Sequence, residues 1–251
     1  MSADYLQLAP WQVAVAAGLI LVNGAISVAL GLALHRRLLV AALRTVVQLA
    51  LVGFVLQWVF ALARWSAVAA LMLVMAVVAG LAAVARTGHR YAGVRLNSVL
   101  SVWMSSWLVT GVALFGILDV EPWYTPQYAI PLLGMLLGNT LNGISLGLDR
   151  FGGDLTEQRH QVEALLALGA TRWEAARPQV RTAVRTGMIP ILNAMMVVGL
   201  VSLPGMMTGQ ILAGIDPLEA VKYQIVILFM IASAPALGTV RVVLLSYRRP
   251  I

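Results

Sequence analysis

Long apolar runs alternate with short polar segments along this chain. The runs cover residues 11 to 34, 44 to 62, 66 to 85, 97 to 118, 127 to 147, 188 to 214 and 220 to 245. Several continue for close to twenty residues without a charge, the length that a helix needs to cross about 30 Å of hydrocarbon. The pattern predicts an all-α membrane protein, a polytopic bundle of about seven transmembrane helices that forms a single domain over residues 1–251.

Composition agrees with this interpretation. Hydrophobic residues make up 61% of the chain and charged residues only 11%, against roughly 45–50% and about 25% in soluble domains. The chain contains no cysteine, which excludes disulfides, thiolate metal sites and cysteine nucleophiles.

The basic residues predict the orientation of the chain in the membrane. With seven spans, fifteen of the 17 Lys and Arg fall on one side, and the other side holds only Arg64 and Lys222. Cytoplasmic loops carry the excess of positive charge, so the N-terminus is predicted outside and the C-terminus inside. Basic cytoplasmic loops thereby account for the net charge of +7, and no nucleic-acid partner is predicted.

The start of the chain predicts that the first helix is retained. The first basic residue is Arg36, which follows the first apolar run, whereas a cleavable signal peptide carries its positive charge before the apolar core. We therefore predict a multi-pass membrane protein, in contact with membrane lipid.

Residues 154 to 186 interrupt the apolar pattern with a segment too polar to span, here called the elbow. Asp154 followed by Glu157 resembles a capping box, which predicts a helix that starts there and ends at Gly169, a residue suited to the left-handed backbone of a helix terminus. Thr171 with Glu174 forms a second capping box and predicts a second helix immediately afterwards.

Proline and arginine mark the second helix of the elbow. Pro178 is predicted to end or kink it, and Arg177, Arg181 and Arg185 share one helical face at four-residue spacing. Taken alone, the arginines are explained by contact with anionic headgroups, and the elbow by a simple connection. Two capped helices are more than a connection requires.

The elbow resembles a known coupling motif. Glu163, Ala164 and Gly169, in the stretch EALLALG, resemble the EAA signature of ATP-binding cassette (ABC) importer permeases, with Leu165 in place of the second alanine. In those proteins the helix-turn-helix docks into a groove of the ATPase subunit. The resemblance implies an ATPase-coupling role for Glu163, Ala164, Gly169, Thr171, Arg172 and Glu174.

Three further stretches are similar to one family over nearly the whole chain. They are LRTVVQLALVGFVLQWVF (43 to 60), PLLGMLLGNTLNGISLGLDRF (131 to 151) and LPGMMTGQILAGIDPLEAVKYQIVILFM (203 to 230). They resemble the Fet-type iron-export ABC permease family (FetB), also known as an uncharacterised-protein family of ABC permeases. The resemblance implies that the bacterial cytoplasmic (inner) membrane is the location of this multi-pass protein. Members of the family are similar to a plant permease linked to aluminium tolerance and to nucleotide-sugar transport, so the resemblance leaves the substrate open.

The family resemblance implies a separate motor subunit, and the sequence agrees. A P-loop ends in Gly-Lys-Ser/Thr, whereas the single lysine, Lys222, follows a valine. The chain is therefore predicted to be a transport subunit and not an enzyme, without a cofactor of its own. ATP and Mg²⁺ are expected in an ABC-type partner, and two copies of the chain are expected to pair with two ATPase subunits.

Polar residues inside apolar runs indicate a substrate path, because such residues usually face a bundle interior or a cavity. Asn139 and Asn142 share a face of the fifth run; packing between helices explains them equally well. Pro204 and Gly205 break the sixth run, and broken helices often mark the binding region of transporters. The predicted path comprises Asn139, Asn142, Pro204, Gly205, Met206, Met207 and Gln210.

Metal ligands are sparse in this sequence. Met206, Met207, Asp216 and Glu219 are the candidates, although thioethers suit Cu(I) better than iron and the two acids fit solvated loop positions equally well. The leading hypothesis is an ABC permease that exports iron or a related metal species. The alternatives are an ABC permease for a non-metal substrate such as a nucleotide sugar, a secondary transporter or channel without an ATPase, and a membrane enzyme acting on lipid.

Overall fold

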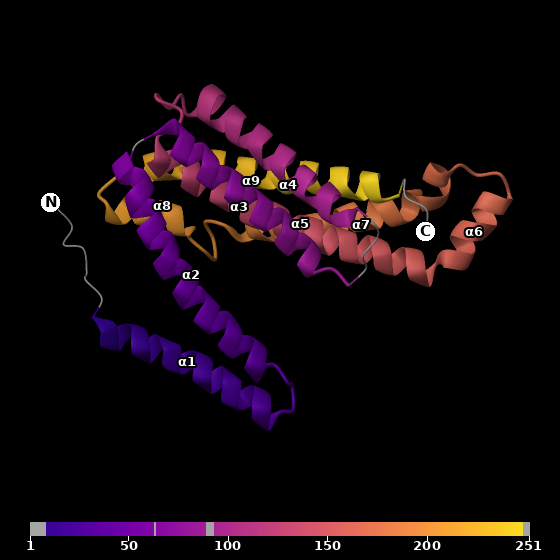
Figure 1. Cartoon of the computed structure of the whole chain (residues 1–251), viewed down its shortest axis with the longest axis horizontal. Coiled ribbons are helices and arrows are strands. Elements are labelled where there is room, and N and C mark those ends of the chain that lie inside the picture. Colours follow the sequence, from indigo (N-terminus) through magenta and orange to yellow (C-terminus); the bar gives the residue numbers. More distant parts are fainter. Residues whose placement is uncertain (1–8, 63, 89–92, 248–251) are drawn as a thin grey trace. The chain divides into compact units, whose positions relative to one another are not determined.

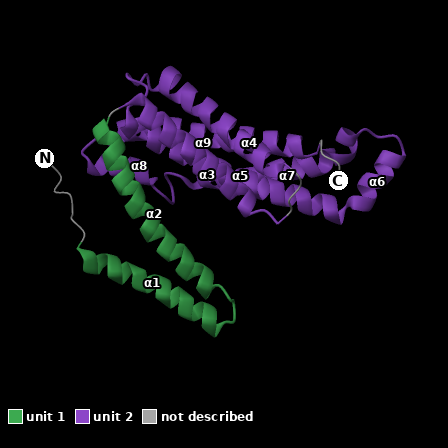
Figure 2. Ribbon diagram, viewed as in Figure 1, with its two compact units in different colours: residues 1–62 green, residues 63–251 purple. Residues whose placement is uncertain are grey.

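The computed structural model of this protein describes residues 9–62, 64–88 and 93–247. Within these residues the structure is built from helices and contains no β-strand, as the apolar runs predict. The chain divides into two compact units, Met1–Leu62 and Ala63–Ile251, which Figure 2 distinguishes by colour. Figure 1 gives the helix labels used below.

Unit 1 is a helical hairpin. Helix α1 (Pro10–Ala29) packs against α2 (His35–Leu62), and the turn between them uses a positive φ of 65° at Gly31. The Ser27 hydroxyl accepts a hydrogen bond of 2.9 Å from the Leu34 N–H and fixes the turn. Most apolar side chains of this hairpin are exposed, Phe54 by 72%, as expected for helices that face lipid or another protein.

Unit 2 is a bundle with one long helix at its centre. Its elements are α3 (Trp65–Ala85), α4 (Val94–Gly111) with a π-helical extension η1 (Val112–Ile117), α5 (Pro126–Glu157), α6 (Arg159–Ala167), α7 (Arg172–Val197), α8 (Gly205–Leu212) and α9 (Pro217–Ser246). Helix α5 packs against α3, α4, α7 and α9, and α9 in turn packs against α4, α7 and α8.

Small residues allow α5, α7 and α9 to approach closely. A Cβ atom on Gly187 of α7 would lie 2.6 Å from the carbonyl oxygen of Gly143 and 2.8 Å from the Thr239 Cγ2 of α9. A Cβ on Gly147, one turn further along α5, would lie 2.6 Å from the same Thr239 methyl group. Gly143 and Gly147, four residues apart on α5, thus permit the close helix approach that small residues at this spacing favour.

Six helical segments within the described residues are long and apolar enough to cross a membrane. They are Pro10–Ala29, His35–Leu62, Trp65–Ala85, Val94–Ile117, Pro126–Glu157 and Pro217–Ser246. The remaining apolar run, 188 to 214, is not one helix, because α7 ends at Val197 and α8 begins at Gly205.

The break in that run starts earlier than Pro204. Gly199 has a positive φ of 82°, and its N–H donates a 3.0 Å hydrogen bond to the Ser202 carbonyl, which closes a turn. Pro204 then has the extended backbone that precedes α8. The break separates two helices and leaves Leu200 89% exposed.

Candidate functional site

The elbow lies at one end of unit 2, where α5 passes into α6 (Figure 1). The prediction that a helix starts at Asp154 is wrong, because α5 continues without interruption from Pro126 to Glu157. Asp154 is 3% exposed and its carboxylate is bound by Arg150, with Nε–Oδ2 and Nη2–Oδ1 distances of 3.1 and 3.0 Å. Asp154 thus lies inside a longer helix, where it forms an i, i+4 ion pair with Arg150 instead of capping a new helix.

The turn of the elbow has the predicted geometry. Helix α6 ends at Ala167 and Gly169 has a φ of 91°, a left-handed conformation that costs glycine little. The Thr171 hydroxyl accepts a hydrogen bond from the Glu174 N–H at 3.3 Å, and the Glu174 carboxylate accepts from the Thr171 N–H at 2.8 Å. The second capping box is therefore present, and α7 starts at Arg172.

The capping box makes the start of α7 sensitive to acid. Hydrogen bonds from the Thr171 hydroxyl and N–H hold the pKa of Glu174 below its usual range. A carboxylate with a lowered folded-state pKa stabilises the structure above its unfolded pKa, about 4.3, and this contribution is lost as the pH falls through the lower folded value.

Replacing Thr171 by alanine is expected to weaken the first turn of α7 by about 1 kcal/mol, as for other lost caps. Hydrogen exchange measured on a peptide covering residues 168–178 should be faster in Thr171→Ala at pH 7, and the difference from wild type should shrink below about pH 4. Thr171→Ser keeps the hydroxyl and should exchange like wild type. Equal exchange in all three proteins would contradict a stabilising cap.

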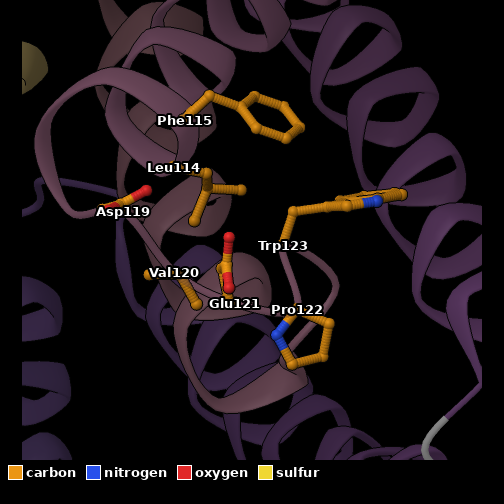
Figure 3. A pocket seen from close by; sticks show the side chains of 7 residues that line it. All are labelled: Leu114, Phe115, Asp119, Val120, Glu121, Pro122 and Trp123. Carbon is orange, nitrogen blue, oxygen red and sulfur yellow. The ribbon is translucent and has the colours of Figure 1, made fainter.

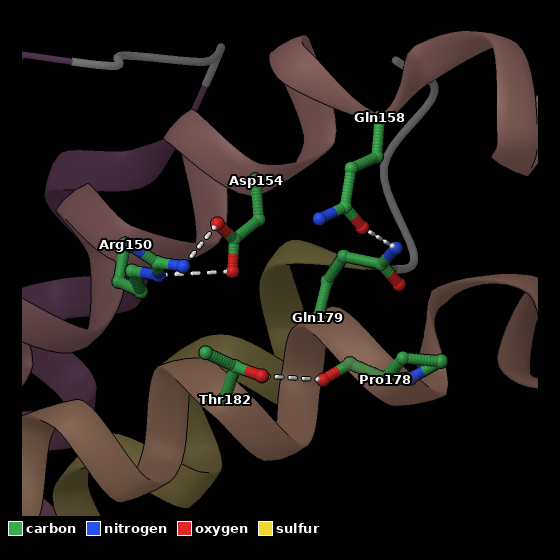
Figure 4. A network of polar contacts seen from close by, with 6 residues as sticks. All are labelled: Arg150, Asp154, Gln158, Pro178, Gln179 and Thr182. Atoms are coloured by element: carbon green, nitrogen blue, oxygen red, sulfur yellow. Dashed lines mark hydrogen bonds and ion pairs between the residues drawn. The ribbon is translucent and has the colours of Figure 1, made fainter.

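Three contacts attach the elbow to the bundle. The side-chain amides of Gln158, at the end of α5, and Gln179 of α7 form a 2.7 Å hydrogen bond (Figure 4). Val162 of α6 is 3% exposed, and the Trp173 ring of α7 lies 5.3 Å from the Tyr247 ring that follows α9. These contacts fix the base of the elbow.

The tip of the elbow is uncovered. Every residue from Glu163 to Gly169 is exposed, Ala164 and Leu165 included, and Leu168 is 85% exposed. Arg159 donates to Glu163 with an Nε–Oε1 distance of 2.7 Å, which holds the pKa of Glu163 below its usual range. Exposed leucines on an otherwise polar segment are typical of an interaction surface.

Pro178 does not end the second helix of the elbow, which continues as α7 to Val197. Its ring removes the partner of the Glu174 carbonyl, but Glu174 is exposed and water can replace that bond. The Thr182 hydroxyl donates to the Pro178 carbonyl at 3.1 Å (Figure 4). Arg177, Arg181 and Arg185 are all exposed on this helix.

The two asparagines of the predicted path occupy the middle of α5. Asn139 is half-buried and donates to the Met135 carbonyl at 2.9 Å. Asn142 is exposed and accepts a 2.9 Å hydrogen bond from the Arg86 guanidinium, just beyond α3. Asn142 therefore links two helices, and Asn139 bonds within its own helix.

The other path residues lie in and before α8, which packs on α9. Met206, Met207 and Gln210 are half-buried, and Gly205 is exposed. Within the described residues the Gln210 Oε1 is buried without a hydrogen-bond partner. Buried amide oxygens are normally satisfied, and this oxygen is an exception.

The acidic candidates have structural partners. The Asp216 carboxylate accepts from the N–H groups of Leu218 and Glu219 at 2.9 and 3.3 Å and caps α9. Glu219 pairs with Lys222 at 2.6 Å. Across the residues that the structure describes, no cluster of three or more His, Cys, Asp or Glu side chains could hold a metal ion.

A pocket that the sequence did not predict is formed by the π-helical extension η1 and the turn that follows it. It has a volume of about 550 Å³ and is lined by Leu114, Phe115, Asp119, Val120, Glu121, Pro122 and Trp123 (Figure 3). The Trp123 ring lies 6.3 Å from Phe115 and 5.8 Å from Tyr124. Phe115, Trp123 and Tyr124 thus form an aromatic cluster, and two of its members, Phe115 and Trp123, line the pocket.

The helices and their apolar surfaces define a polytopic membrane protein. Comparison of the sequence with known families shows that the chain belongs to the uncharacterised protein family UPF0014, whose profile matches residues 10–251.

Curated relatives cover most of the chain. A UPF0014 membrane protein of Synechocystis is 42% identical over 87% of this chain and 85% of its own length. The probable iron export permease protein FetB of Escherichia coli is 33% identical over 87% and 83%. Protein ALUMINUM SENSITIVE 3 of Arabidopsis thaliana is 35% identical over 83% and 75%. No solved structure matches the chain significantly.

Proposed function

We propose that this protein is the membrane-spanning permease subunit of an ABC transporter and that the tip of its elbow docks on a separate ATPase subunit. The observation that supports this proposal best is that every residue from Glu163 to Gly169 is exposed. These residues lie in and just after α6, which directly follows α5, the central helix of the bundle. Contacts with the bundle fix the base of the elbow. In the described part of the chain, no residue covers its apolar tip. Such a surface fits a protein partner.

The proposal includes an orientation with the N-terminus outside and seven passes, the broken α7–α8 segment being one of them. The elbow then lies in the cytoplasm, where ATP is available, and the partner binds ATP and Mg²⁺. Two permease copies with two ATPase subunits would give each elbow one docking site. ATP-driven closure of the ATPases would move both elbows and reorient the bundle by alternating access.

Iron or a related metal species is the proposed substrate, and export the proposed direction. The name of the Escherichia coli relative supports this choice. The break at residues 198–204 supports a path beside α8, because irregular backbone at membrane depth is tolerated where it lines a cavity. Met206, Met207 and Gln210 would line this path, with Asn139 and Asn142 on α5.

Replacing Leu168 by glutamine is expected to lower capture of the ATPase about tenfold, since it removes an apolar anchor from the interface centre. The measurement is affinity capture from detergent-solubilised native membranes, with bound proteins identified by mass spectrometry and ATP hydrolysis assayed. Leu218→Gln is the matched control, because Leu218 is a 72% exposed leucine distant in sequence from the elbow.

Substrate transport gives an independent readout. The Gln210→Leu variant should retain ATPase capture and lose most Fe²⁺ export from cells. If wild type captures no P-loop ATPase while Leu168→Gln and wild type export Fe²⁺ equally, the protein works as a carrier without an ATPase. If wild type captures the ATPase but deletion of this protein leaves Fe²⁺ export from cells unchanged, iron is rejected as the substrate.

A further inference from the structure

An apolar groove lies between α4 and α9. It has a volume of about 410 Å³ and is lined by Met104, Ser105, Leu108, Leu237, Val240, Arg241, Leu244 and Leu245. Leu108 and Leu237 are 59% and 47% exposed, so the groove opens on the outer surface of unit 2. Both of its walls belong to helices that are long and apolar enough to span the membrane.

One cation lies within this apolar surface. The Arg241 guanidinium donates to the Met104 sulfur, a weak acceptor. In the part of the chain that the structure describes, no carboxylate lies within ion-pairing distance of Arg241. Arginine in a spanning segment is costly unless it pairs with an anion or reaches the interface.

The position of Arg241 along α9 suits the headgroup level of the membrane. Arg241 precedes the end of α9, Ser246, by five residues, which corresponds to about 8 Å along the helix. Its side chain can therefore reach toward the polar end of the helix, while Leu237, one turn earlier, lies deeper in the hydrocarbon. The groove thus has an apolar deep end and a cationic shallow end.

We propose that this groove binds an anionic phospholipid, with an acyl chain along Leu108 and Leu237 and the headgroup phosphate on Arg241. Basic pockets between transmembrane helices bind anionic headgroups in this way. A phospholipid supplies both an apolar chain and an anionic phosphate. A second copy packed symmetrically on the same groove would instead bring its own Arg241 close to this one, because Arg241 is the only charged residue among the described residues that line the groove.

The test measures lipid binding to the full-length protein by native mass spectrometry in a mild detergent. Phosphatidylglycerol and phosphatidylcholine with identical acyl chains are compared. Wild type should retain phosphatidylglycerol at least about fivefold more strongly, and Arg241→Gln should lose that preference. Arg241→Lys keeps the charge and should keep most of the preference. Arg159→Gln removes an exposed arginine of α6 that pairs with Glu163 and should bind like wild type.

Three results would overturn the proposal. They are equal retention of the two lipids by wild type, an unchanged preference in Arg241→Gln, and a disulfide-linked dimer formed in native membranes by Leu108→Cys. The last would show that a second copy covers the groove, and it is easily interpreted because the natural chain has no cysteine. The assay contains no ATPase, so its outcome is independent of the proposed transport function.

Discussion

Replacing Gly187 by alanine is expected to destabilise unit 2 by about 1–3 kcal/mol, the usual cost of an overpacked core. The new Cβ would lie 2.6 Å from the Gly143 carbonyl oxygen, which belongs to the backbone of α5. A backbone atom cannot turn away as a side chain can, so α7 and α5 must separate. That separation would also weaken the contacts of both helices with Thr239 of α9.

The matched control for Gly187→Ala is Gly138→Ala on α5, where a Cβ would meet nothing within 4 Å. Alanine is the better helix former by about 1 kcal/mol, so this control should be neutral or more stable than wild type. Unfolding by SDS in mixed micelles measures both variants. Equal stability of the two variants would show that the α5–α7 approach tolerates a methyl group.

Replacing Arg150 by alanine is expected to destabilise the base of the elbow by about 1–3 kcal/mol. Breaking a buried ion pair leaves an uncompensated charge, and the figure is reduced here because the Arg150 side chain is 50% exposed. Asp154, the partner left behind, is buried where α5 meets α7 (Figure 4). Its carboxylate would have to be hydrated, and the entry of water disturbs the packing.

Arg159→Ala is the control for this experiment, because it breaks an ion pair of the same i, i+4 spacing whose partners are both exposed. Exposed pairs contribute little, so unfolding should be nearly unchanged. Adding Asp154→Asn to Arg150→Ala removes the buried charge and should recover most of the lost stability. If Arg150→Ala loses no more stability than Arg159→Ala, the buried charge of Asp154 is not what makes the first substitution costly.

Local backbone chemistry in the elbow was predictable from sequence. Gly169 and the Thr171–Glu174 capping box act within a few residues, so the pattern alone contains the required information. Asp154 has the same local pattern with Glu157, yet the Arg150 ion pair and burial against the bundle keep it inside α5. A local pattern does not reveal whether the preceding residues are already helical.

The break before α8 shows a similar limit. Pro204 pointed to a discontinuity, but the helix ends at Val197, where the positive φ of Gly199 closes a turn. The hydrophobicity of residues 188 to 214 does not change across this turn, so hydropathy alone predicts one span. The groove between α4 and α9 could not be predicted from sequence either, because it depends on which faces of these two helices meet.

The length of α5 has a mechanical consequence. Its 32 residues form a rod of about 48 Å, which is longer than a hydrocarbon core of about 30 Å. The elbow follows directly on one end of this rod. The only proline inside it, Pro131, lies near the opposite end. A sideways displacement of about 5 Å at the elbow would tilt such a rod by about 6°. Asn139 and Asn142 would then move with α5 as one lever arm, without any loop to absorb the motion.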